Sequence, residues 1–129
     1  MKFFPWGIGA LKDEPSNPRG GYHFLNFSDP ENPVEEAIYQ VPEAGSHNMW
    51  IVGDTLITGN YQGGLRIVDI SGELLGDIYK QGREIGVYLS LHENGRIPNS
   101  PMVWGAQPYK EYIFFADMNS GLYLSLIHI

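Results

Sequence analysis

Short apolar clusters separated by turn-forming residues recur along the chain. The clusters cover residues 22–27, 37–41, 48–52, 55–61, 65–70, 86–91, 102–105 and 112–118. They are rich in β-branched and aromatic residues, which favour strands, and each is bounded by Gly, Pro, Asn or Asp. Sixteen glycines and nine prolines supply the turns that many short strands need. The pattern therefore predicts an all-β chain.

Two segments between these clusters carry more specific signals. The Gly-Asp pair at 53–54 lies between two strand-like clusters and predicts a hairpin turn. In the segment 72–86, Leu74 and Ile78 have near-helical spacing, but each of the two glycines inside it disfavours a helix by about 1 kcal/mol. We expect a turn of helix or an irregular connection there.

One punctuated strand pattern occurs more than once. The stretch "GGLRIVDIS" at 63–71 resembles "GGYHFLNFS" at 20–28, and 43 residues separate Gly21 from Gly64. A third unit is anchored at Gly121, 57 residues after Gly64, because "ITGNYQGGL" aligns with "FFADMNSGL". The extra length of the second interval is expected in loops.

A period in the low forties with about four strands per unit is the size of a β-propeller blade. We therefore expect residues 1–123 to form blades of four antiparallel strands in an incomplete propeller, with repeats starting near 21, 64 and 121. Propeller blades are apolar on both faces and pack between similar blades. Packing between blades is accordingly expected for Phe24, Ile51, Ile57, Leu65, Ile67 and Phe114.

The repeat also assigns structural positions. These are Gly21, Asn26, Gly63, Gly64, Asp69 and Gly121. Asn26 and Asp69 are polar residues at matching places in apolar strands, and we expect them to hydrogen-bond nearby backbone where the strand ends. No second carboxylate stands at ligand spacing, so a metal site is not predicted.

The segments "GGLRIVDIS" and "FSDPENP", with the block at 46–85 and the stretch at 101–123, resemble the LVIVD repeat, a β-propeller blade of bacterial proteins. The resemblance covers roughly residues 20–123. It implies a propeller in a secreted, periplasmic or cell-surface protein, and it implies no particular chemistry. Because a closed propeller needs about four to eight blades, a chain with two to three repeats is expected to be a fragment whose first partners are the remaining blades of its parent.

Charge and composition disfavour several classes of binding partner and site. Fifteen acidic against eight basic residues give a net charge of −7, which disfavours nucleic acid or an anionic membrane as a partner. Cysteine is absent, so disulfides and thiolate metal sites are excluded. No apolar run approaches the length of a transmembrane helix. No cofactor is predicted.

The polar and aromatic residues that could bind a ligand are His47, Asn48, Trp50, Asn60, Tyr61, Trp104, Asp117 and Asn119. Aromatic rings beside amides suit a protein, peptide or glycan ligand, because stacking and hydrogen bonds then combine. The leading interpretation is a non-catalytic binding module. The alternative is part of a propeller hydrolase or oxidoreductase with a site near His47 at the channel mouth, although no catalytic set can be assembled from the sequence.

The last six residues, "LSLIHI" at 124–129, match the translation of CTG TCT CTT ATA CAC ATC, a common transposase adapter of sequencing libraries. An apolar end could equally form a last strand. However, the repeat interval puts Leu126 where Asp69 stands and His128 where Ser71 stands, so the repeat pattern stops where the adapter match begins. We predict that these residues are not native.

Sequencing the source DNA by a method without that adapter tests this prediction. The reading frame is expected to leave "LSLIHI" after residue 123 and to continue into further repeats. A stop codon directly after Ile129 would contradict it.

Overall fold

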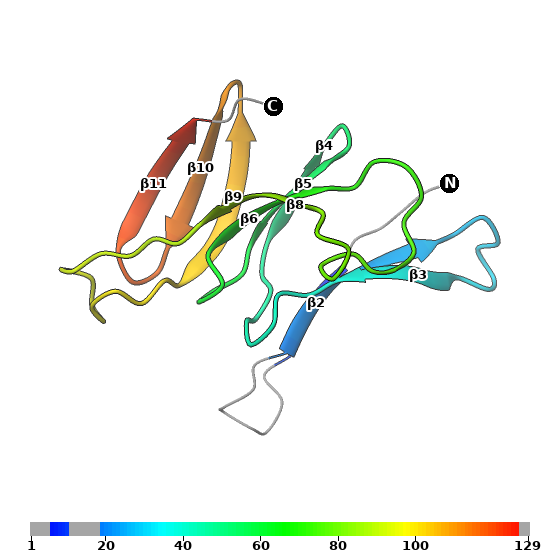
Figure 1. The fold of residues 1–129 in the computed structure, drawn as a ribbon, viewed down its shortest axis with the longest axis horizontal. Helices are drawn as coiled ribbons and strands as arrows, with labels where there is room; N and C mark the ends of the chain where they lie inside the picture. Colours follow the sequence, from blue (N-terminus) through cyan, green and yellow to red (C-terminus); the bar gives the residue numbers. More distant parts are fainter. Residues whose placement is uncertain (1–5, 11–18, 127–129) are drawn as a thin grey trace.

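The computed structural model describes residues 6–10 and 19–126, and over these residues the chain is all-β, as predicted. Eleven strands form three separate sheets, none of which closes on itself (Figure 1). Sheet A contains β1 (Trp6–Ala10), β2 (Arg19–Asn26), β3 (Val34–Tyr39) and β7 (Gly76–Asp77). Sheet B contains β4 (Met49–Val52), β5 (Thr55–Gly59), β6 (Leu65–Asp69) and β8 (Glu84–Tyr88). Sheet C contains β9 (Val103–Tyr109), β10 (Tyr112–Asp117) and β11 (Gly121–Leu126).

The C-terminal segment is described only in part. Leu124 to Leu126 belong to β11, where they pair with β10. His128 and the other residues of 127–129 lie outside the described residues, as do residues 1–5 and 11–18. Among the residues that the structure covers, no helix is present that could span a membrane.

The expectation of four antiparallel strands per sheet holds for sheet B alone. The order β4-β5-β6-β8 is antiparallel throughout, with the predicted turn at 53–54, where Gly53 has a φ of 55°. In sheet A the fourth strand, β7, is two residues long and runs parallel to β3. In sheet C three strands are described.

No helix forms in the segment 72–86. Its two inner glycines, Gly76 and Gly82, have positive φ angles, which suit turns and not a helix. The segment is the irregular connection that was the other expectation, and it carries β7 to the edge of sheet A. Leu74 and Ile78, whose spacing suggested a helix, are instead buried in the core between sheets A and B.

The three sheets stack front to back. We call the front of each sheet the face that carries Tyr22 and Phe24 in sheet A, Ile57 and Leu65 in sheet B, and Phe114 and Leu122 in sheet C; the back is the other face. The front of sheet A packs on Leu56 and Val68 from the back of sheet B. The front of sheet B packs on Val103, Ala106, Ile113 and Phe115 from the back of sheet C. Each interface therefore uses the same pair of faces.

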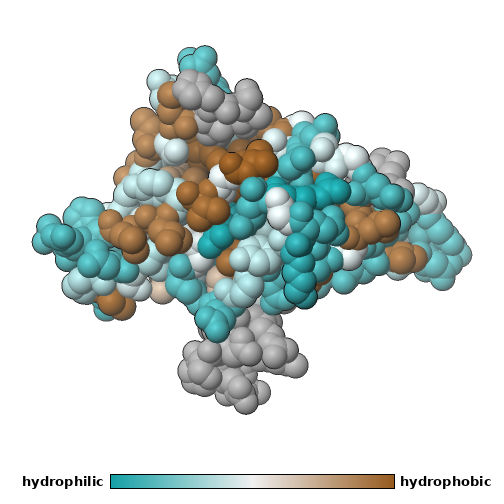
Figure 2. Space-filling view, viewed as in Figure 1, coloured by the Kyte–Doolittle hydropathy of each residue, from teal (hydrophilic) through white to brown (hydrophobic). Residues whose placement is uncertain are grey.

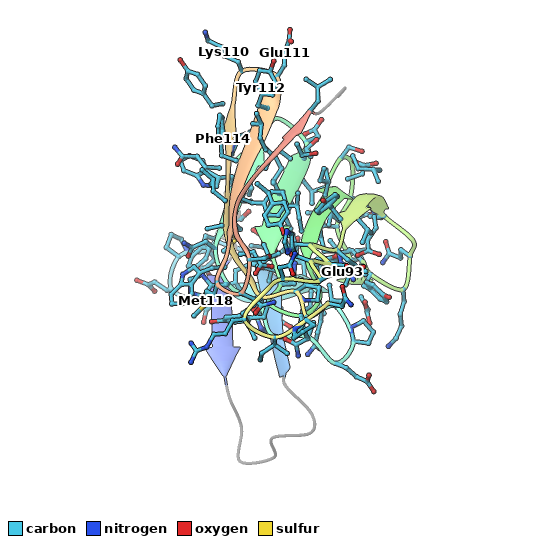
Figure 3. The ribbon with its side chains drawn as sticks, turned by 90° about the vertical axis from the view of Figure 1, so that its left-hand side faces the viewer. Glu93, Lys110, Glu111, Tyr112, Phe114 and Met118 are labelled. Atoms are coloured by element: carbon cyan, nitrogen blue, oxygen red, sulfur yellow. The ribbon has the colours of Figure 1, made fainter. Side chains whose placement is uncertain are left out.

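The front of sheet C is uncovered in the described residues. By strand register it carries Gly105, Gln107, Tyr109, Tyr112, Phe114, Ala116, Leu122, Leu124 and Leu126, none of which is charged. Apolar side chains gather over this sheet in Figure 2, and Leu122 is 75% exposed. In Figure 3, Phe114 projects from the sheet, whereas the charged Lys110 and Glu111 lie at the tip of the β9–β10 hairpin.

The residues that were predicted to pack between blades differ in their burial. Phe24, Ile57 and Leu65 are buried between sheets and Ile67 is partly buried there, as expected. Ile51 is 40% exposed, so it is not buried between sheets as predicted; it lies near the β4–β5 turn and lines a pocket together with Phe24.

The strand-end polar residues form the local hydrogen bonds that were predicted. Asn26 Oδ1 accepts from the backbone N–H and the hydroxyl of Ser28, and Asp69 Oδ1 accepts from the N–H of Ser71. The Ser71 hydroxyl and N–H hold the pKa of Asp69 below its usual value. Both side chains thus replace the ladder bond that the backbone loses where it leaves the sheet.

Stability of matched variants tests the stacking. Ile57→Ala removes a fully buried side chain and is expected to lower the free energy of unfolding by about 2–4 kcal/mol. Phe114→Ala, 57 residues later on the same face of the next sheet, is expected to cost about 1 kcal/mol or less, since surface substitutions have small effects. Urea denaturation followed by circular dichroism measures both. Equal losses would mean that the front of sheet C is covered in solution.

Candidate functional site

The strongest candidate site lies where the three sheets meet. Beyond the end of β5, Tyr61 and Val103 exchange backbone hydrogen bonds of 2.8 and 3.0 Å, which join sheet B to the start of β9. The N–H of Asn48 also donates to the carbonyl of Trp104 at 3.2 Å. These bonds fix the first strands of sheets B and C side by side.

Tyr22 ties sheet A to the same point. Its hydroxyl donates to the carbonyl of Gly59 at 2.8 Å and accepts from the N–H of His47 at 3.2 Å. Burial raises the pKa of Tyr22 to about 12, so the hydroxyl keeps its proton and its donor role at neutral pH. One buried phenol therefore connects sheet A to the end of β5 and to the segment before β4 in sheet B.

An aromatic cluster covers this junction. The ring centroids of His47 and Trp104 are 4.5 Å apart, and those of His47 and Tyr61 are 5.4 Å apart in an edge-to-face arrangement. Tyr61 and Trp104 complete the triangle at 6.5 Å. The structure thus brings together three of the predicted binding residues. We call His47, Tyr61 and Trp104 the aromatic cluster.

His47 carries an unusual polar atom. Its Nδ1 is buried and has no hydrogen-bond partner among the described residues, and the same holds for the hydroxyl of Ser46. Burial lowers the pKa of His47, although a backbone hydrogen bond involving Trp104 opposes this effect. The imidazole is therefore neutral at pH 7 and can accept one hydrogen bond.

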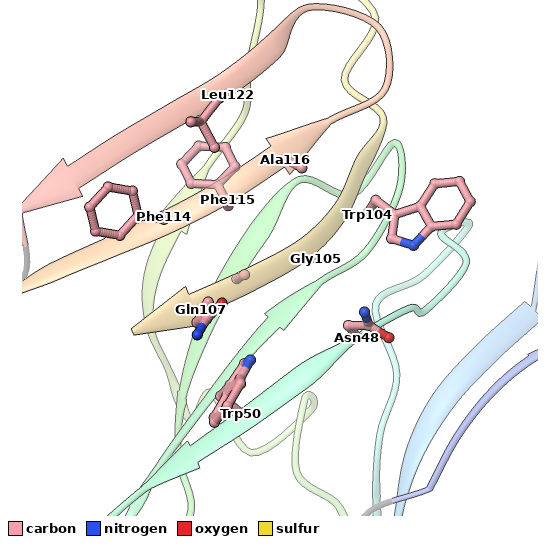
Figure 4. Close-up of a pocket in the computed structure, with 10 residues that line it drawn as sticks. Asn48, Trp50, Trp104, Gly105, Gln107, Phe114, Phe115, Ala116 and Leu122 are labelled. Atoms are coloured by element: carbon pink, nitrogen blue, oxygen red, sulfur yellow. The ribbon is translucent and has the colours of Figure 1, made fainter. Parts of the chain in front are cut away.

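A pocket of about 330 Å³ extends from Trp104 across β4 and β9. Trp50 and Trp104 are 46% and 41% exposed, and Trp50 points toward Gln107 in Figure 4. The lining residues are Asn48, Trp50, Trp104, Gly105, Ala106, Gln107, Phe114, Phe115, Ala116 and Leu122. No lining residue is charged, and two amide side chains supply its hydrogen-bonding groups.

Three of the predicted binding residues stabilise turns and loops instead. Asn60 is buried, and its Nδ2 donates to the hydroxyl of Thr58 at 2.9 Å. Asp117, which is 57 residues later, is buried at the equivalent end of β10. Asn119 holds the loop before β9, because its amide bonds with backbone groups of Ile97 and Ser100.

Asp117 organises that loop with its charge. Burial alone would raise its pKa, but the N–H of Met102, the Ser90 hydroxyl and the N–H groups of Asn119 and Ser120 together hold the pKa below its ordinary value of 3.8. The N–H of Met102 donates at 2.8 Å and that of Asn119 at 2.7 Å. This carboxylate is thus fully engaged in hydrogen bonds of the fold.

The repeat glycines are explained by close approach. A Cβ on Gly63 would lie 2.8 Å from the Cβ of Ala44, and one on Gly21 would lie 3.3 Å from the carbonyl oxygen of Tyr39. Gly64 has a φ of 78° and would collide with the carbonyl of Tyr88. Gly121 also has a positive φ, of 105°, but its Cβ would meet no atom within 4 Å.

Sequence reasoning missed part of the pocket wall. Phe114 was expected to pack between sheets, yet it lines the pocket, and so does Leu122. Gln107, which also lines the pocket, is not among the predicted binding residues. The 57-residue interval could have found it, because it places Gln107 on the position of Trp50.

The part of the chain that the structure describes holds no group of three His, Cys, Asp or Glu residues that could bind a metal ion. Comparison with known proteins finds no matching family model, no similar curated protein and no similar solved structure.

The acid stability of the chain tests the role of Asp117. Because its folded pKa lies below the unfolded value, Asp117 stabilises the fold above about pH 4, and this contribution is lost as the pH falls through the folded pKa. Asp117→Asn is expected to lower the unfolding free energy by about 1–3 kcal/mol at pH 7 and to weaken its decline toward pH 3. Urea unfolding at each pH measures this, and Asp54→Asn at an exposed turn is the control. A parallel decline in both proteins would contradict the assignment.

Proposed function

We propose that this chain is a segment of a β-propeller, of the LVIVD-repeat type, in an exported or cell-surface bacterial protein. The segment binds an uncharged ligand at the junction of its first strands and does not catalyse a reaction. The observation that carries the binding role is the aromatic cluster with the adjoining pocket, which presents two exposed indoles beside amides.

The stacking supports the propeller. Sheets A, B and C meet front to back through equivalent residues, which is how blades follow one another around an axis. The first described strands of sheets B and C, β4 and β9, are neighbours at the junction. In a propeller the first strands line the central channel, so the aromatic cluster would stand at the channel mouth.

The remaining blades of the parent protein are the first proposed partners. The exposed, uncharged front of sheet C would be covered by the back of the next sheet, as the front of sheet B is covered by sheet C. That sheet would cover the pocket wall formed by Phe114 and Leu122. The wall formed by Asn48, Trp50 and Gln107 lies on the first strands, and we assign ligand binding to it together with Trp104.

A glycan is the ligand class that this wall fits best. Indole faces stack on the apolar faces of sugar rings, and the amides of Asn48 and Gln107 can both donate to and accept from hydroxyl groups. The absence of charged lining residues disfavours an ionic ligand. A peptide or protein ligand is the competing possibility.

The catalytic alternative rests on the neutral His47 with its unpartnered Nδ1. A general base needs a substrate proton within reach and commonly a group that orients the ring. Such a group would have to come from another part of the parent protein.

Titration with uncharged oligosaccharides tests the proposal, with chitotriose, cellotetraose and maltotetraose as probes. At least one probe is expected to shift the indole N–H signals of Trp50 and Trp104 in NMR spectra. Trp104→Ala should weaken its binding about tenfold, equivalent to about 1.4 kcal/mol.

Tyr109→Ala is the matched control, because Tyr109 is an exposed aromatic of the same strand outside the pocket lining. This variant should bind as the unchanged chain does. The glycan proposal fails if no probe shifts the indole signals, or if Trp104→Ala binds as well as the control.

A further inference from the structure

One strand beside the repeat strand, β3 in sheet A and β8 in sheet B, has the same sequence pattern in both sheets. β3 contains Glu35-Glu36-Ala37-Ile38-Tyr39, and β8 contains Glu84-Ile85-Gly86-Val87-Tyr88. In both strands these five residues are, in order, Glu, any residue, a small residue, a β-branched aliphatic residue and Tyr. Each pairs antiparallel with the repeat strand, β2 or β6. We call this pattern the edge motif.

The two edge motifs also pair in the same register. Tyr39 lies opposite Tyr22, and Tyr88 lies opposite Leu65, at positions that the 43-residue interval makes equivalent. A register shift follows the third residue of the pairing in both sheets, between Phe24 and Leu25 in sheet A and between Ile67 and Val68 in sheet B. Beyond the shift, Glu35 faces Leu25 and Glu84 faces Val68.

The glutamate of each motif is paired with a cationic or ionisable side chain of the repeat strand. Arg66 Nη1 lies 2.8 Å from Glu84 Oε1, and His23 Nδ1 lies 2.6 Å from Glu35 Oε2. His23 and Arg66 are equivalent by the same interval. The backbone pairing, the bulge and the contact to the glutamate therefore repeat together, which a chance pairing would not produce.

The repeat glycine makes room for the edge motif. In sheet B the Gly64 position faces the carbonyl of Tyr88, and in sheet A the Gly21 position faces the carbonyl of Tyr39. A side chain at either glycine would press on the backbone of the motif's tyrosine. The neighbouring strand, as well as the glycine's own turn, therefore restricts this position to glycine.

The third repeat strand, β11, has no such neighbour among the described residues. It pairs with β10 on one side, and a Cβ at Gly121 would meet open space. Leu122, Leu124 and Leu126 are all exposed. An unpaired edge strand offers a row of backbone N–H and C=O groups to an incoming strand.

We propose that the free edge of β11 binds an extended segment carrying the edge motif, Glu-x-(Ala/Gly)-(Ile/Val)-Tyr, as an added antiparallel strand. In the register of sheets A and B, the motif's tyrosine lies opposite Leu122, its small residue opposite Leu124 and its glutamate opposite Ser125. The tyrosine carbonyl lies against Gly121. Main-chain hydrogen bonds supply most of the attraction, as in other strand-addition complexes.

This inference rests on the repeat architecture of the proposed function and is independent of the glycan site. A failure of oligosaccharide binding would leave it intact. Failure of strand addition would remove the proposed completion of sheet C without affecting the aromatic cluster.

The test uses the full chain with a synthetic peptide of its own residues 82–90, GREIGVYLS, at millimolar concentration. Hydrogen exchange read by NMR is expected to slow at least tenfold for the β11 amides that point away from β10. A scrambled peptide of the same composition should leave exchange unchanged. Because a short free peptide binds weakly, the same segment is also joined to the C-terminus through a flexible Gly/Ser linker, which raises its effective concentration.

Two variants of the linked protein sharpen the test. Gly121→Ala should abolish the protection, since the new Cβ would collide with the docked tyrosine carbonyl. Gly53→Ala also puts Ala at a positive φ with open space around it, but far from β11, and should keep the protection. A second version of the linked protein carries Ser125→Val and Leu126→Asp, which are the residues that β6 has at the equivalent positions, so the result does not depend on the origin of residues 125 and 126.

The proposal is overturned if the linked motif gives no protection, if the scrambled segment protects equally, or if Gly121→Ala retains full protection. It is also overturned if the chain alone shows protection of β11 that grows with protein concentration, because a second copy would then occupy the edge.

Discussion

The fold depends on one constraint, that a small sheet with two apolar faces must be covered on both of them. The chain meets it by stacking equivalent faces, so that the front of each sheet rests on the back of the next. Tyr22 and Phe24 are buried for the same reason as Ile57 and Leu65, although sheet A includes a parallel strand pair and sheet B is antiparallel throughout. The front of sheet C is also apolar, and none of the described residues covers it. Burying it would require a further sheet.

The stacking also creates the candidate site. Because the sheets meet front to back, the starts of β4 and β9 lie side by side, and the hydroxyl of Tyr22 links sheet A to Gly59 and His47 beside them. This rigid junction holds His47 and Trp104 in contact at the rim, where their rings cannot be fully buried. The aromatic cluster is therefore a consequence of the packing, and the binding role proposed for it needs no movement of the backbone.

The sequence predicted the strands and the local chemistry of the repeat well. Periodicity and turn residues located the strands, because side-chain alternation and glycine turns act over a few neighbouring positions. The hydrogen bonds of Asn26 and Asp69 were predictable for the same reason, since each reaches only two residues along the chain. The near-helical spacing of Leu74 and Ile78 does not produce a helix, because Gly76 and Gly82 adopt positive φ angles and both apolar side chains are buried in the core between sheets A and B.

The sequence by itself determined an all-β chain with a recurring strand and its turn glycines, a net charge of −7 and the absence of cysteine. Only the tertiary structure decided which of the candidate residues meet. Asn60, Asp117 and Asn119 were drawn into turns and the loop before β9, whereas Trp104 joined His47 from a strand more than fifty residues away. The edge motif likewise became visible only when β3 and β8 were seen in the same register. Contacts of this kind depend on how whole sheets are stacked. A pattern confined to neighbouring residues does not encode contacts between residues that are far apart in the chain.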